Sequence, residues 1–157
     1  MTMQDDLNNI LREAAYHGDL PAIEEFVEMG ADPAAGRSEA LAVAAQQGHL
    51  DCVKRLLALG ARLEDQQHLA LRLAAEQGHL DTLRFLLDQG SDPCAKDNYA
   101  IGMATKNGHL DCVKLLHMRG ADIFTRNNTL ILLAANAGHQ EIVTYLQEHE
   151  VSDRGEA

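Results

Sequence analysis

The segment AAEQGHLD, residues 74–81, recurs along the chain at intervals of thirty residues. It is AAQQGHLD at 44–51 and ATKNGHLD at 104–111, with weaker copies AAYHGDLP at 14–21 and AANAGHQE at 134–141. A fixed period in this range predicts a row of small stacked units instead of one globule. Such a row offers a long surface for holding another molecule and no obvious pocket for chemistry.

Each copy marks a pair of short helices joined by a glycine, which ends the first helix because it adopts the left-handed conformation cheaply. In the first helix an aliphatic residue is followed, three and four positions later, by two small residues on the same helix face. The aliphatic residues are Leu11, Leu41, Leu71, Ile101 and Ile131. A second glycine, at Gly30, Gly60, Gly90 and Gly120, closes the second helix. The predicted fold is therefore an all-α solenoid of five stacked helix–turn–helix units.

Polar loops return the chain from one unit to the next. Ser38, Asn98 and Asn128 stand just before a first helix. Side chains of this kind accept hydrogen bonds from the first helical turn, so we predict that these three residues are N-caps.

These residues carry a family resemblance. The run at residues 74–81, with Phe85-Leu86-Leu87 and Gly90-Ser91-Asp92 after it, resembles an ankyrin repeat, and the likeness covers about residues 7–148. The period is thirty residues instead of the usual thirty-three or so, and the opening Thr-Pro-Leu-His of the family is missing. The resemblance therefore implies shortened inter-repeat loops, with the family's projecting β-hairpins short or replaced by simple turns.

We expect one domain over residues 1–149, with units at about 7–36, 37–66, 67–96, 97–126 and 127–149, and a flexible acidic tail at 150–157. Glu13 and Gln147 place polar side chains where the inner units have apolar ones. Both ends of the row are thus expected to be polar caps, which would make the stack complete and favour a monomer.

The net charge of −11 is concentrated toward the two ends of the chain. Residues 1–36 carry eight acidic side chains and one basic one, and residues 141–157 carry five and one, whereas the middle is balanced. Polar ends that keep a solenoid soluble explain this pattern, and an acidic patch for a partner with a basic surface explains it as well. Nucleic acid is not an expected partner, because phosphates require net positive charge.

The composition also bears on the compartment. No apolar run approaches the length needed to cross a bilayer, and the acidic start does not resemble a secretion signal. Three cysteines without paired spacing argue against a disulfide framework. We therefore expect a cytoplasmic protein that does not contact a membrane.

Recurrent histidines at His49, His79, His109 and His139 could suggest a metal site. Packed helices lie about 8–10 Å apart, too far for shared ligands, and in ankyrin-like repeats this histidine hydrogen-bonds the backbone of the adjoining unit. Cys52 and Cys112 follow a helix-start aspartate and could be reactive, but small buried hydrophobes explain them better. His117 is either a pH-sensitive or partner-contacting residue, or an imidazole at the edge of the core.

No catalytic constellation, cofactor motif or metal-binding motif is present, so we expect a non-enzymatic protein. The resemblance implies a concave face that contacts a partner protein through the positions that vary between units. These predicted contact residues are Tyr16, His17, Arg37, Gln46, Gln47, Gln66, His68, Glu76, Gln77, Lys96, Tyr99, Lys106, Asn107, Arg126, Asn127 and Asn136. The predicted function is a protein-interaction module or adaptor. The alternative is a dedicated inhibitor, such as an immunity-type protein that blocks a toxin or enzyme.

Overall fold

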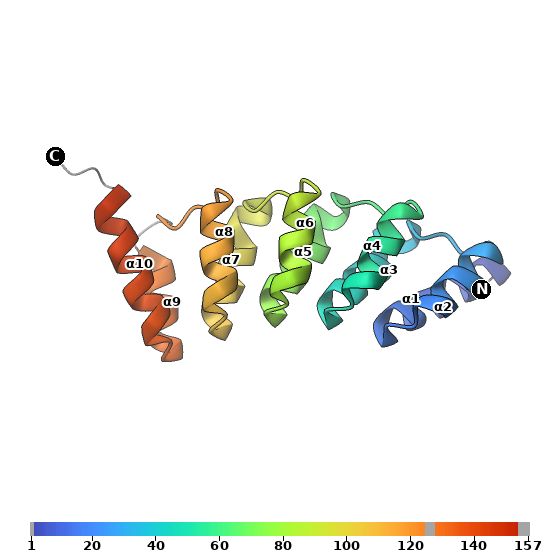
Figure 1. The fold of residues 1–157 in the computed structure, drawn as a ribbon, viewed down its shortest axis with the longest axis horizontal. Helices are drawn as coiled ribbons and strands as arrows, with labels where there is room; N and C mark the ends of the chain where they lie inside the picture. Colours follow the sequence, from blue (N-terminus) through green and yellow to red (C-terminus); the bar gives the residue numbers. More distant parts are fainter. Residues whose placement is uncertain (1, 125–127, 154–157) are drawn as a thin grey trace.

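The computed structural model describes residues 2–124 and 128–153, with side chains as far as Glu150. Within these residues the chain forms ten helices and no strand, which confirms the predicted all-α class. The helices stand as five pairs in chain order, and the connections between pairs run along one edge of the row (Figure 1).

Each unit contributes one first helix and one second helix. The first helices are α1 (Met3–His17), α3 (Ala35–Gln47), α5 (Asp65–Gln77), α7 (Ala95–Asn107) and α9 (Thr129–Ala137). The second helices are α2 (Leu20–Glu28), α4 (Leu50–Ala58), α6 (Leu80–Asp88), α8 (Leu110–Met118) and α10 (Gln140–Asp153). The first helices of neighbouring units pack more closely than the second helices do, so the row is tightest on the first-helix side.

The small residues of the repeat explain this close packing. Ala44, Ala45, Ala74 and Ala75 are fully buried between neighbouring first helices, where a larger side chain would hold the backbones apart. Ala135, which has no following unit against it, is exposed. The small pairs are therefore interface residues, and the second residue of each pair is buried only where a following unit covers it.

Both predicted sets of helix-ending glycines adopt the backbone conformation that their role requires. Gly48 has φ 76° and follows the end of α3, and its neighbour His49 donates its N–H to the Ala44 carbonyl. Gly60 has φ 112° at the end of α4, and Ala61 donates to the Leu56 carbonyl in the same way. These bonds satisfy carbonyls that the last helical turn would otherwise leave open.

The turns before the first helices differ from the prediction. Three consecutive residues in each of three units have positive φ: Gly36, Arg37 and Ser38, then Gln66, Gln67 and His68, then Lys96, Asp97 and Asn98. Eight of these nine are not glycine, and such residues avoid the left-handed region because Cβ meets the following carbonyl. The projecting β-hairpins of the family are thus replaced by tight left-handed turns.

The N-cap prediction is wrong for Ser38 and Asn98. Both residues lie inside a left-handed turn, and neither side chain bonds the first turn of its helix. Ser38 Oγ instead accepts the Arg62 N–H at 2.9 Å, and Asn98 Oδ1 accepts the Asp122 N–H at 2.8 Å. They therefore hold the return loop of their own unit. Asn128 does precede α9 as predicted, but without a side-chain cap bond.

The two ends of the row also differ in part from expectation. Glu13 and Gln147 are exposed, as predicted, but Ile10 is 43% exposed on α1 and Leu132 is 57% exposed on α9, so neither end is uniformly polar. The predicted flexible tail does not begin at Glu150, because α10 continues to Asp153. The rest of that predicted tail, residues 154–157, lies outside the described residues.

Candidate functional site

The variable residues predicted to contact a partner lie mainly on one side of the row, which we call the inner face. It is formed by the exposed and half-buried side chains of the first helices and by the left-handed turns before them. Tyr16, Gln46, Glu76, Lys106 and Asn136 occupy the same place in successive first helices, and all are exposed or half-buried. The structure thus brings these five predicted residues into one line.

The backbone beneath this line is fixed by the recurrent histidines. The Nε2–H of His79 donates to the Gln46 carbonyl at 2.8 Å, across the boundary between two units. The same bond joins His49 to Tyr16, His109 to Glu76 and His139 to Lys106, at 2.9–3.0 Å. This confirms the predicted backbone role of the histidines.

Each of the four histidines hydrogen-bonds a different backbone carbonyl of the preceding unit. No group of three or more histidine, cysteine or acidic side chains that could hold a metal ion occurs among residues 2–124 and 128–150. The repeat histidines therefore connect neighbouring units through hydrogen bonds to the backbone.

The next position along the first helices also lies on the inner face. It carries predicted contact residues that are exposed or half-buried: His17, Gln47, Gln77 and Asn107. Asn107 is partly engaged, because its Nδ2 donates to the Glu76 carbonyl at 2.8 Å. That carbonyl also accepts from His109, so the boundary between the third and fourth units carries an additional hydrogen bond.

The left-handed turns contribute the remaining predicted residues. Arg37 and Lys96 are exposed, whereas Gln66 reaches back to the preceding turn and donates to the Arg37 carbonyl at 3.2 Å. His68 is half-buried as a residue, but its Nδ1 atom is buried and has no hydrogen-bond partner. His68 occupies the repeat position of Ser38 and Asn98, whose side chains turn toward the return loop, so it is less available to a partner than predicted. Arg126 and Asn127 lie outside the described residues.

Arg72 is a functional candidate that the sequence reasoning missed. Its side chain is on the inner side of α5 and only 6% exposed. Its guanidinium donates to the carbonyls of Gln66 and Gln67, at 2.8 and 3.0 Å, and lies 5.1 Å from the centre of the Tyr99 ring. The signal was a charged residue at the repeat position that Ala42 and Gly102 occupy in the neighbouring units.

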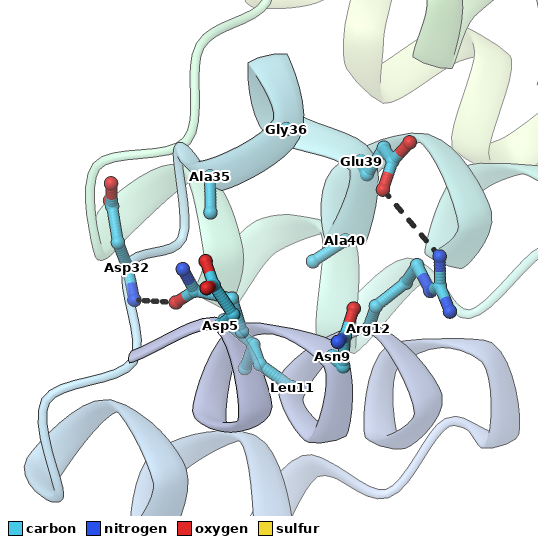
Figure 2. Close-up of a pocket in the computed structure, with 10 residues that line it drawn as sticks. Asp5, Asn9, Leu11, Arg12, Asp32, Ala35, Gly36, Glu39 and Ala40 are labelled. Carbon is cyan, nitrogen blue, oxygen red and sulfur yellow. Dashed lines mark hydrogen bonds and ion pairs between the residues drawn. The ribbon is translucent and has the colours of Figure 1, made fainter. Parts of the chain in front are cut away.

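A hollow between the first and second units is lined by polar side chains (Figure 2). It has a volume of about 290 Å³. Asn8 Oδ1 accepts the Asp32 N–H at 2.8 Å on one side, and Arg12 forms a 3.7 Å ion pair with Glu39 on the other (Figure 2). Its polar groups are therefore largely paired with one another, and none of the predicted contact residues lines it.

A larger hollow, about 740 Å³, lies on the inner face between the fourth and fifth units. Three predicted contact residues line it, Lys96, Tyr99 and Lys106. Its floor includes Met103 and Leu133, which are half-buried. This hollow combines apolar surface with two cationic side chains on the face that the sequence predicted.

Cys52 and Cys112 are not reactive centres of this surface. Cys52 and Cys112 are each 2% exposed, which confirms them as small buried hydrophobes. Burial, together with the nearby Asp111 carboxylate, raises the pKa of Cys112 to about 11, and burial followed by Asp51 and Asp19 raises the pKa of Cys52. A thiol with a raised pKa is a poor nucleophile near neutral pH.

His117 lies in an aromatic cluster at the C-terminal end of the row. Its Nδ1 is 2.8 Å from the Tyr145 hydroxyl oxygen, and its ring centre is 5.3 Å from that of His149. The half-buried ring agrees with the interpretation of His117 as an imidazole at the edge of the core. It is not on the inner face.

The chain matches one known family over most of its length. A family model of ankyrin repeats (3 copies) matches residues 11–97 and again residues 100–156, well over half of the chain. A search of the curated proteins found no match. Among residues 2–124 and 128–153, none of the helices has the length and apolar content to span a bilayer.

Proposed function

Because the chain belongs to the ankyrin-repeat family, whose repeats mediate protein–protein interaction, we propose that it binds another protein on its inner face. The proposed contact residues are the predicted set that the structure describes, with Tyr16 and Tyr99 as anchors. Aromatic side chains commonly dominate binding because they bury a large area at low cost in side-chain entropy.

One observation supports this proposal above the others. The carbonyls of Tyr16, Gln46, Glu76 and Lys106 all accept a histidine N–H from the next unit, whereas their side chains are different in every unit. At these positions the hydrogen bond between units uses only the backbone carbonyl. The side chains can therefore vary without loss of that bond. A surface of this kind is suited to recognition.

The charge distribution suits a partner with a basic surface at the N-terminal end. Asp5, Asp6, Glu13 and Glu24 are exposed there. The capping box at Thr2 holds the pKa of Asp5 below its usual value, since the Thr2 N–H and hydroxyl donate to the carboxylate. A monomer in the cytoplasm completes the proposal; the cytoplasmic part agrees with three cysteines that are all free.

The test is co-purification from the native host with the full chain, followed by mass spectrometry. We expect the wild type to retain one partner, and the double change Tyr16→Ala and Tyr99→Ala to release it. Arg84→Ala is the matched control, because Arg84 is exposed on α6, outside the inner face. A partner lost equally from the control, or no specific partner at all, would contradict the proposal.

The same preparation distinguishes an adaptor from a dedicated inhibitor. An adaptor would be recovered with a partner whose activity persists in the complex. An inhibitor would be recovered with one enzyme or toxin that regains activity when the complex is dissociated.

A further inference from the structure

The hollow between the fourth and fifth units contains an open space above Gly102. A Cβ built at this helical residue would meet no atom within 4 Å. The same repeat position carries Arg72 in the preceding unit and Leu132 in the following one. The hollow is therefore unfilled at Gly102, where the preceding unit carries a long side chain.

The walls around that space are apolar. Among its lining residues, Met103 and Leu133 are half-buried, Leu130 is 4% exposed, and Phe124 is exposed. Apolar surface left half-covered gains free energy when a further apolar group excludes water from it. The volume of about 740 Å³ accommodates a leucine-sized side chain together with the backbone that carries it.

Lys96 and Lys106 line the same hollow, and Arg72 lies near it against the Tyr99 ring. Lys96 and Arg72 lie 5.2 and 5.1 Å from the centre of the Tyr99 ring, and Lys106 is exposed one helical turn beyond Met103. None of these three cations has a carboxylate within ion-pair distance among the residues that the structure describes, whereas Arg12, Arg55, Arg62 and Arg119 each do. Two carboxylates also line the hollow: Asp122 accepts the Phe124 N–H of its own loop at 2.7 Å, and Asp97 is exposed beside Lys96 without an ion pair among the described residues.

From this arrangement we infer that the hollow between the fourth and fifth units takes an extended segment of a partner protein in which a leucine-sized apolar side chain is followed by acidic residues. The apolar side chain occupies the space above Gly102, between Met103 and Leu133. The acidic side chains face Lys96 and Lys106. The inference rests on the proposed function and names the partner chemistry for this end of the inner face.

The surface charge of the chain makes this pairing specific. An acidic segment is repelled by residues 1–36, which carry eight acidic side chains and one basic one, whereas the hollow is lined by Lys96 and Lys106, which have no ion-pair partner among the described residues. Opposite charges fix the register of a segment, whereas the apolar contact supplies most of the affinity.

The experiment titrates the full isotope-labelled chain with short synthetic peptides and follows amide signals by NMR. The probe carries one leucine followed by two glutamates, and the two control peptides replace the leucine with alanine or the glutamates with lysines. We expect saturable shifts at Gly102 and Lys106 with the probe, at least about tenfold weaker binding of both control peptides, and weakening of the probe by salt.

Gly102→Leu places a side chain in this space, and the fold accepts it because no neighbouring atom lies within 4 Å of the added Cβ. This variant should weaken the probe at least about tenfold. Lys96→Gln and Lys106→Gln should each weaken the probe and reduce its salt dependence, whereas Arg84→Gln should leave both unchanged. The urea midpoint of each variant verifies that it is folded.

Equal binding of the acidic and basic peptides, binding unaffected by Gly102→Leu, or no saturable shift with the probe would each overturn the inference. The co-purification assay separates this failure from failure of the proposed function. A native partner that Gly102→Leu retains and Tyr16→Ala releases would leave the proposed function intact and overturn only the inference made here.

Discussion

The imidazole of His79 lies directly over Gly48 of the preceding unit. A Cβ at residue 48 would stand 2.5 Å from His79 Nδ1, and on the other side of the ring Nε2–H donates to the Gln46 carbonyl at 2.8 Å. The glycine is thus required twice, once by its φ of 76° and once by the ring that covers it. The same pairing joins His49 to Gly18, His109 to Gly78 and His139 to Gly108.

Gly48→Ala tests this double requirement against Gly138→Ala. Gly138 has φ 81° but nothing within 4 Å of its added Cβ, so its substitution carries only the left-handed strain of about 1–2 kcal/mol. Gly48→Ala should cost about 1 kcal/mol more, because His79 must move and lose its hydrogen bond. Urea unfolding measures both values, and equal losses would show that the ring contact contributes nothing.

Ala75→Leu tests whether the small residues set the spacing between units. Ala75 is fully buried, so the larger side chain should separate α5 from its neighbour and cost about 1–3 kcal/mol. Ala135→Leu is the matched control, because Ala135 occupies the same repeat position but is exposed. The control should stay within about 0.5 kcal/mol of the wild type. An unchanged urea midpoint in Ala75→Leu would contradict the packing scheme.

Arg72→Met tests the buried guanidinium. The methionine keeps much of the side-chain length but leaves the carbonyls of Gln66 and Gln67 without their donors, so we expect a loss of about 1–3 kcal/mol. Arg84→Met, on the exposed face of α6, should change little. A more stable Arg72→Met variant would mean that the cost of burying the charge exceeds the value of its hydrogen bonds.

The thiol of Cys112 predicts a pH dependence of stability. Its pKa is about 11 in the folded chain against an ordinary 9.0, so the folded state holds the proton more tightly than the unfolded state. The stabilising contribution is present below about pH 9 and is lost as the pH rises toward 11. Stability should therefore fall less steeply over this range in Cys112→Ala than in the wild type, as measured by urea unfolding at each pH. A difference between the two proteins that does not change with pH would contradict the assignment.

The repeat period and the helix-ending glycines were predictable from sequence because each depends on local chemistry. A glycine after a small pair has few alternatives to ending a helix, and five registered copies reinforce one another. The backbone role of the histidines at His49 and its equivalents followed from the family resemblance. The inner face was predictable in outline for the same reason, since it consists of the repeat positions that vary.

The turns were not predictable in detail. Ser38 and Asn98 have the side chains of N-caps, but the backbone N–H groups of Arg62 and Asp122 in the return loops occupy the same oxygen atoms, and both residues have a left-handed backbone. The buried position of Arg72 was hard to predict from the sequence. Its partners are backbone carbonyls and an aromatic ring, and neither requires an acidic residue that could be recognised in the sequence. The hollow above Gly102 depends on two neighbouring units at once, so no single repeat indicates it.

The histidine bond between units spans thirty-three residues and always joins one unit to the next. No comparable bond among the described residues joins units that are further apart along the row. Tension applied to the two ends of the chain would consequently be carried through these boundaries in series, so that the weakest boundary gives way first and the remaining pairs stay folded. Such an array can lengthen stepwise under load, a mechanical property that a single globular core of the same length does not have.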